Sequence, residues 1–255
     1  MILAVDVGNT DTKFGVFRGA ELVARWSLHS DPNRSVEEYT DFLRAMLQYR
    51  RVEHVARAII GSVVPLLTPV LATALAEATG SAPVILRSET VPGIRLHVET
   101  PAQVGVDRVA NAIAVRTHYG GPAIVIDFGS ATTFDLVNAD GDLLGAIIAP
   151  GMVTSARALT SAGAQLPAIR VARPEKLVGT NTVGAMQSGV YWGYVHMVRG
   201  VIDHLRRELG ANYRAIATGG LAPGLIEDVG VFDLVDADLT LKGLVGIAAA
   251  LEGAS

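Results

Sequence analysis

The same arrangement of residues occurs twice in this chain, about half a chain length apart. Apolar runs end at Asp6 and at Asp127, and each aspartate is followed by a spacer residue, a glycine and small polar residues. The two aspartates lie 121 residues apart in a sequence of 255. Such a repeat predicts two related halves, each with a strand that ends in an Asp–x–Gly turn. We therefore expect an α/β fold whose two halves face each other.

Hydrophobic periodicity adds the other elements of each half. Short apolar runs bounded by turn residues predict strands at 2–5, 13–17, 21–28, 58–63, 84–86, 123–126, 133–137, 143–148 and 214–217. Apolar residues at three- and four-residue spacing predict helices at 35–46, 65–79, 104–117, 182–208 and 241–251. The strand pattern restarts near Gly120, so we expect one α/β domain over 1–118 and a second over 119–255.

The first Asp–x–Gly turn has the residue types of a phosphate site. Gly8 and the small residues after it let backbone N–H groups approach a phosphate closely. Asp6 stands at a strand end, where α/β folds place ligands, and a carboxylate there can hold Mg²⁺, often through water. The alternative is a hairpin in which Asp6 only stabilises the turn by hydrogen bonds. The first turn alone does not decide between these interpretations.

The second turn, Asp127-Phe128-Gly129-Ser130, has a similar alternative, in which hydroxyl groups bind the local backbone. Two such turns at half-chain spacing favour a functional interpretation. The reason is that Asp–Gly turns from two facing halves form a natural clamp for a metal and a phosphate.

Two further motifs suit a nucleotide and a small substrate. Thr218-Gly219-Gly220 follows an apolar run, and paired glycines leave room for a base and a sugar. Gly105-Val106-Asp107-Arg108 opens a helix and places an acid, a candidate base, beside a cation, a candidate anion anchor. The alternatives are an ordinary strand-to-helix turn and a favourable first-turn acid. Taken in isolation, each motif is explained better by its alternative.

Composition and missing motifs exclude several classes of function. The chain has no cysteine, which excludes disulfides, thiolate nucleophiles and Cys-ligated zinc. Its net charge of −4 provides no basic footprint for nucleic acid, and no GxxxxGK[ST] loop is present. No apolar run approaches the roughly 18 residues that span a bilayer, and the N-terminus has no leader pattern. We expect a cytoplasmic protein with neither nucleic acid nor membrane as a partner.

Six stretches in order resemble the type III pantothenate kinases, a branch of the acetate kinase, sugar kinase, Hsp70 and actin superfamily. They are DVGNTDTK at 6–13, GVDR at 105–108, DFGSATT at 127–133, IAPGM at 148–152, GTNTVGAMQSG at 179–189 and ATGGLA at 217–222. The resemblance implies two facing ribonuclease H-like domains. The first would carry a phosphate turn and the substrate motif, and the second a phosphate turn and the adenosine motif. It also implies ATP-dependent phosphorylation of pantothenate to 4′-phosphopantothenate, the first step of coenzyme A biosynthesis.

The resemblance further implies roles for individual residues. Asp107 would be the general base, Asp127 would lie at a monovalent cation (K⁺ or NH₄⁺), and Asp6 at Mg²⁺, directly or through water. The residues implied to contact pantothenate are Gly105, Val106, Asp107, Arg108 and, across a homodimer interface, Thr182. The residues implied to bind ATP are Asp6, Val7, Gly8, Asn9, Thr10, Asp11, Thr12, Lys13, Ser130, Gly219 and Gly220.

Two positions depart from the family pattern. Ser130 stands where family members commonly carry Thr, and the hydroxyl group is kept. Val98 stands where members commonly carry Tyr, nine residues before the catalytic aspartate, which bears on substrate affinity and pocket shape. Two alternative functions stay open. One is an ATP-binding regulatory module without catalysis, and the other is a different small-molecule kinase or phosphatase of the superfamily.

The helix expected from Thr182 onward bears on the homodimer. Its residues Val183, Met186, Val190, Tyr194 and Met197 form an apolar face. This face packs either across a dimer interface or within its own domain, and periodicity alone favours the second.

Overall fold

The computed structural model describes residues 1–163 and 165–253 and contains two compact units. Unit 1 comprises Met1–Gly120, Val137–Gly145 and Asp238–Ser255, and unit 2 comprises Gly121–Leu136 and Ala146–Ala237. The chain first crosses between them close to the expected boundary. The division differs from the expected ranges because a hairpin tip and the C-terminal helix belong to unit 1.

Unit 1 is built on a five-stranded sheet in the order β3-β2-β1-β4-β5. Strand β1 (Ile2–Val7) pairs antiparallel with β2 (Asp11–Arg18) and parallel with β4 (Arg57–Ser62). The outer strands are β3 (Glu21–His29) and β5 (Val84–Ile85). The antiparallel meander and the α/β class expected from the sequence are confirmed.

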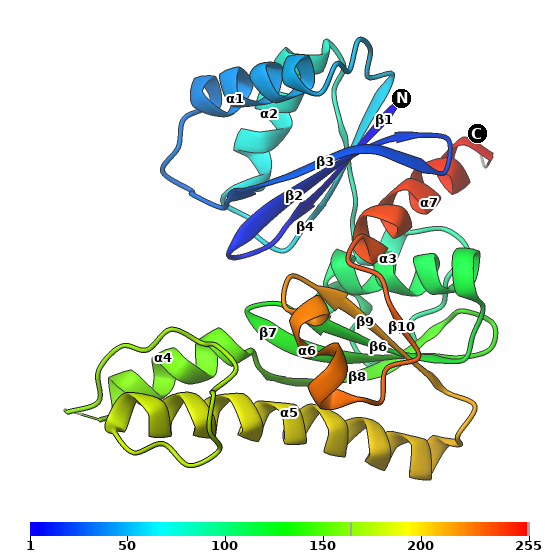
Figure 1. Ribbon diagram of the computed structural model, residues 1–255. Coiled ribbons are helices and arrows are strands. Elements are labelled where there is room, and N and C mark those ends of the chain that lie inside the picture. Colours follow the sequence, from blue (N-terminus) through cyan, green and yellow to red (C-terminus); the bar gives the residue numbers. More distant parts are fainter. Residues whose placement is uncertain (164, 254–255) are drawn as a thin grey trace. The chain divides into compact units, whose positions relative to one another are not determined.

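Helices cover both faces of this sheet (Figure 1). Helices α1 (Val36–Tyr49) and α2 (Thr68–Thr79) pack on one face, against side chains such as Leu3 and Val5. Helices α3 (Val106–Ala114) and α7 (Leu239–Gly253) pack on the other, against Ala4 and its neighbours. Because side chains alternate along a strand, Asp6 points to the same face as Ala4, the face that α3 and α7 cover.

The second sheet repeats the first. Its order is β10-β9-β6-β7-β8. The first three strands along the chain, β6, β7 and β8, lie side by side, and β9 and β10 lie on the other side of β6. Unit 1 has the same arrangement, which confirms the internal repeat. The strands are β6 (Ala123–Phe128), β7 (Ala131–Val137), β8 (Leu143–Pro150), β9 (Arg214–Gly219) and β10 (Leu234–Val235).

Three helices accompany the second sheet: α4 (Met152–Ala162), α5 (Thr182–Leu209) and α6 (Ala222–Val229). Side chains of all three join one core with Ile124, Ile126 and Phe128 of β6. The sequence predicted α5 but neither α4 nor α6. Among the described residues, no helix, including the 28-residue α5, is both long and apolar enough to cross a membrane.

Candidate functional site

Asp6 is held at the carboxyl end of β1 by its two neighbouring strands. It lies opposite Lys13 on β2 and opposite Gly61 on β4. Its side chain is largely buried, and Lys13 Nζ lies 3.7 Å from Asp6 Oδ2. An aspartate with 8% of its surface exposed is costly unless it is paired, and this ion pair provides compensation. The pair also places a positive and a negative group together at the strand end.

The turn after Asp6 is braced by the end of β3. Gly8 N donates to Asp11 O at 3.2 Å, which closes the turn. Ser30 Oγ donates to Gly8 O at 2.7 Å and lies 2.9 Å from Thr12 Oγ1. The tip residue Asn9 is exposed. Ser30 was not predicted, because it lies in a loop far along the chain and nothing local in the sequence marks it.

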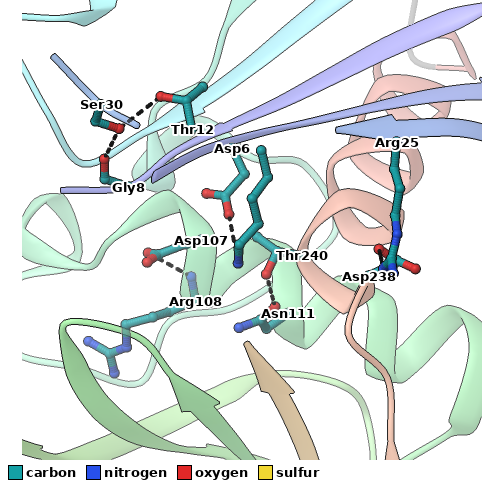
Figure 2. Close-up of polar contacts among 11 residues, drawn as sticks. Asp6, Gly8, Thr12, Arg25, Ser30, Asp107, Arg108, Asn111, Asp238 and Thr240 are labelled. Carbon is teal, nitrogen blue, oxygen red and sulfur yellow. Dashed lines mark hydrogen bonds and ion pairs between the residues drawn. The ribbon is translucent and has the colours of Figure 1, made fainter. Parts of the chain in front are cut away.

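Asp107 lies in the first turn of α3, after the N-cap residue Gly105. Its Oδ1 accepts a hydrogen bond of 2.9 Å from Arg108 N. A Cβ atom on Gly105 would lie 2.2 Å from that oxygen, so any other residue there would displace the carboxylate. In Figure 2 the Arg108 guanidinium extends away from the Asp107 carboxylate. The backbone N–H group of Arg108 therefore holds the Asp107 carboxylate in place.

The Asp6 turn and the start of α3 lie in the same part of unit 1. Gly61 is the strand neighbour of Asp6, and a Cβ atom on Gly61 would lie 3.1 Å from Val106 Cγ1. The first turn of α3 thus packs one strand away from Asp6. Figure 2 shows the Asp6 side chain extending from β1 toward the helix that carries Asp107. The Asp6–Lys13 pair and the first turn of α3, which carries Asp107, therefore lie in one region although they are far apart in the sequence.

In unit 2, Asp127 lies next to the double-glycine motif. Strands β6 and β9 pair in parallel, with Asp127 opposite Thr218 and Phe128 opposite Gly219. Gly219 has φ of +90°, and a Cβ atom on it would lie 2.7 Å from Asp127 Oδ1. Glycine is required here by both the backbone angle and the close approach. The predicted cation residue and adenosine motif thus form one cluster.

Thr218 adds an unexpected polar atom to this cluster. Only 1% of its surface is exposed, and its Oγ1 has no hydrogen-bond partner among the described residues. A buried hydroxyl without a partner costs about 1–3 kcal/mol. Strand alternation puts the Thr218 and Asp127 side chains on the same face of the sheet. An oxygen with a free lone pair therefore lies beside the Asp127 strand.

The Ser130 turn is fastened by the start of α4. Gly151 N donates to Ser130 O at 3.1 Å, and Thr154 Oγ1 donates to the same oxygen at 2.6 Å. A Cβ atom on Gly151 would lie 2.3 Å from Gly129 O, so glycine is needed for this contact. The Ser130 side chain itself is exposed. The turn is thus fixed through the backbone carbonyl of Ser130.

A buried tyrosine packs beneath the Asp127 turn. The Tyr194 ring contacts Phe128, and its hydroxyl lies 2.5 Å from Thr132 Oγ1. Burial raises the pKa of Tyr194 to about 12; the hydrogen bond with Thr132 opposes the rise, and the Asp127 charge adds to it. Tyr194 is therefore neutral at physiological pH and supports the turn as a hydrogen-bonding group.

Thr182 begins α5 and is exposed. The preceding residue, Asn181, caps the helix: its Oδ1 accepts from Gly184 N at 2.8 Å. These residues, with Leu159 of α4 and Leu166, line an open pocket of about 610 Å³. The predicted apolar face of α5 is mostly used within unit 2, since Met186 and Tyr194 are buried; Val183 remains exposed.

Comparisons with known proteins agree with one another. The model of the family described as "Type III pantothenate kinase" matches residues 2–204. A type III pantothenate kinase of Dehalococcoides mccartyi is 40% identical over 245 residues, which are 95% of each chain. One of Paramagnetospirillum magneticum is 41% identical over 250 residues, 97% of this chain and 96% of the relative.

Two solved structures share the fold at low sequence identity. A conserved putative Baf family transcriptional activator from Campylobacter jejuni has a TM-score of 0.57 at 18% identity and covers 98% of this chain and 99% of its own. The activator of the 2-hydroxyisocaproyl-CoA dehydratase from Clostridium difficile, with bound ADPNP, has a TM-score of 0.57 at 13% identity. It covers 99% of this chain and 96% of its own. These likenesses support the α/β fold expected for the superfamily.

Proposed function

The chain belongs to the type III pantothenate kinase family, and we propose that it transfers the γ-phosphoryl group of ATP to the primary hydroxyl of pantothenate. The observation that carries this proposal is the arrangement in unit 1. The largely buried Asp6 and the partly exposed Lys13 form an ion pair on either side of a turn whose tip is exposed, and a helix-borne carboxylate lies in the same region. Phosphoryl transfer needs this kind of positioning and charge neutralisation more than covalent help from the protein.

We assign the phosphates of ATP to the turn from Asp6 to Lys13. Its backbone N–H groups can bind phosphate oxygens, and Lys13 supplies a positive charge. In unit 2 we assign Ser130, through its exposed hydroxyl, to the phosphates, and the Gly219–Gly220 segment to the adenosine. A Cβ atom on Gly220 would meet nothing within 4 Å, and this open space supports close approach of a flat ligand there.

We assign pantothenate to Gly105–Arg108. Asp107 is proposed to accept the proton of the attacking hydroxyl, and the Arg108 guanidinium to bind the pantothenate carboxylate. Phosphoryl transfer needs positioning of the attacking hydroxyl more than it needs a strong base. Asp107 therefore acts mainly by orienting the hydroxyl until phosphoryl transfer is well advanced.

The residues also suit the proposed cations. Among the described residues, no three His, Asp or Glu side chains are clustered so that they could hold a metal ion by themselves. Mg²⁺ in kinases is held by one or two carboxylates and by substrate phosphates, and Asp6 is placed to contribute one carboxylate. Asp127 and the unpaired Thr218 hydroxyl offer oxygen ligands for K⁺ or NH₄⁺. Bound cations would neutralise phosphate charge.

The proposed function is tested by measuring ADP release from ATP with and without pantothenate. We expect release to depend on pantothenate, and the same assay with other small hydroxy acids tests substrate choice. A high rate that is independent of any acceptor would indicate an ATPase. A preference for another hydroxylated substrate would indicate a different kinase of the superfamily.

Replacing Gly105 with alanine is expected to lower kcat by about 10²-fold, because the new Cβ atom displaces the Asp107 carboxylate. The fold should persist, since φ of −61° at this residue suits alanine. The matched control is Gly200→Ala, at a helical position where a Cβ atom meets nothing within 4 Å. We expect the control to keep full activity, and full activity of Gly105→Ala would contradict the role of Asp107.

Activity is expected to rise several-fold when K⁺ or NH₄⁺ replaces Na⁺ at constant ionic strength. K⁺ and NH₄⁺ are larger and more weakly hydrated than Na⁺. They therefore lose less hydration free energy when they leave water for the Asp127 carboxylate and the Thr218 hydroxyl. Asp127→Asn should remove the response. Thermal unfolding gives a second readout, since K⁺ should raise the Tm of the wild type and not of the variant. Equal activity and equal Tm in Na⁺ and K⁺ would exclude this assignment.

A further inference from the structure

A buried polar contact joins the two helices that cover one face of the unit 1 sheet. Thr240 Oγ1, in the first turn of α7, donates to Asn111 Oδ1 of α3 at 2.9 Å (Figure 2). Asn111 is 0% exposed and Thr240 is 3% exposed. Hydrogen bonds in such surroundings are costly to break, because each partner would remain buried without water. Neither residue belongs to the assigned site.

The rest of the contact between α3 and α7 is close and apolar. A Cβ atom on Gly243 would lie 1.8 Å from Ala110 O, so the two backbones touch there. Around this point, side chains such as Val109 and Leu244 belong to one core. Apolar packing sets the distance between the helices and limits sliding, but it carries no directional bond. The Thr240–Asn111 hydrogen bond supplies the directional contact that fixes their register.

This register determines where Asp107 lies. Asp107 and Asn111 are four residues apart on α3, so they occupy the same face of the helix, one turn apart. Because α3 has nine residues, a shift or tilt at Asn111 is carried almost unchanged to Asp107. A displacement of 1 Å at a reacting group can cost about 10²-fold in rate.

The start of α7 is in turn fastened to the sheet that carries Asp6. Arg25 Nη1 donates to Asp238 Oδ1 at 2.9 Å, immediately before α7, and Arg25 lies opposite Gly15 of β2. A Cβ atom on Gly15 would lie 3.1 Å from Leu241 Cδ1, so the first turn of α7 packs directly on β2. Contacts therefore run without a break from the sheet, through α7 and Asn111, to the helix of Asp107.

We propose that Thr240 and Asn111 are positioning residues, which set the place of the Asp107 carboxylate relative to the Asp6 turn. The expected loss of kcat rests on the proposed function. The expected loosening of α3 does not depend on it. Removing the Thr240 hydroxyl should therefore lower kcat more than it changes the KM for ATP, because the Asp6 turn lies on a different element.

The test compares Thr240→Val with Thr40→Val. Thr40 is 2% exposed, and its Oγ1 donates to Glu77 Oε2 at 3.1 Å, from α1 to α2 on the opposite face of the same sheet. Both variants remove a buried hydroxyl that joins two helices, and both should lower Tm by a few degrees. We expect kcat to fall about 10-fold or more in Thr240→Val and to stay within about twofold in Thr40→Val. Thr240→Ser, which keeps the hydroxyl, should restore kcat.

Hydrogen exchange separates this inference from the proposed function. Amides of α3 should exchange faster in Thr240→Val than in the wild type, and Thr40→Val should leave them unchanged. If the wild type does not phosphorylate pantothenate, the proposed function is wrong. The exchange rates would still show whether Thr240 fixes the position of α3. Thr240→Ala, which adds no bulk, serves if the valine variant does not fold. Unchanged kcat together with unchanged α3 exchange, or equal losses of kcat in both Thr→Val variants, would overturn the proposal.

Discussion

Asp107→Asn is expected to lower kcat for pantothenate phosphorylation by about 10²–10⁴-fold, the usual loss when a positioned acid–base group is removed. The substitution changes little else. An asparagine Oδ1 can still accept the hydrogen bond from Arg108 N, so the first turn of α3 should persist. The KM for ATP and the Tm should stay close to their wild-type values. Steady-state kinetics and thermal unfolding of the purified variant provide these measurements.

A first-turn acid on another helix of unit 1 is the matched control. Glu37 lies in the first turn of α1, and hydrogen bonds from its own backbone and from Ser35 lower its pKa. Glu37→Gln thus removes a comparable helix-terminal charge outside the assigned site. We expect full activity from this control. If Asp107→Asn matched it, Asp107 would be a helix-terminal charge and the general base would have to be sought elsewhere.

Mixing two inactive variants is expected to restore activity if the working unit is a homodimer with shared sites. The proposal rests on exposed apolar side chains of unit 2 that cluster in sequence around β8, α4 and the start of α5. They are Ile147, Ile148, Val153, Leu159, Leu177, Val178 and Val183. Exposed apolar surface of this kind often marks an interface. Thr182 lies beside Val183. If a partner subunit covers this surface with its substrate site, Thr182 would reach the substrate bound by that partner.

The two variants are Asp107→Asn and Thr182→Arg, whose long side chain should block the shared site. Each homodimer has a defect in both sites, whereas a mixed dimer has one site free of both. Random exchange makes half of the dimers mixed, so about a quarter of all sites should be active. Asp107→Asn mixed with Lys13→Ala is the control, because both defects lie in unit 1 and no intact site forms. Verified mixed dimers that stay inactive, or a fully active monomer, would reject shared sites.

The repeat of Asp–x–Gly turns predicted the fold well because it is a local signal that occurs twice. Each turn follows an apolar strand, and the two sheets have the same order of strands. By contrast, α6 has eight residues, about two helical turns, too few for a clear helical period to emerge. The C-terminal helix was predicted, but its return to unit 1 was not. That return depends on packing between Gly243 and Ala110, which no local pattern reveals.

The candidate site divides in the same way. Asp6, Asp107, Asp127 and the glycines could be named from the sequence because strand ends and helix starts mark them. The residues that brace them could not. Ser30 holds the first turn from the loop after β3, and Thr240 holds α3 from the far end of the chain. Such contacts join segments whose spacing along the sequence carries no signal, so they appear only when the fold is known.

The identity of the product decides whether this chain phosphorylates pantothenate. Purified protein would be incubated with pantothenate, ATP, Mg²⁺ and K⁺ until the pantothenate is consumed, and the product examined by mass spectrometry and ³¹P NMR. We expect one ADP per pantothenate and a phosphate monoester on the primary hydroxyl, with about 1% or less of that product from Asp107→Asn over the same period. A phosphorylated carboxylate, or no phosphorylated pantothenate from the folded wild-type protein, would contradict it.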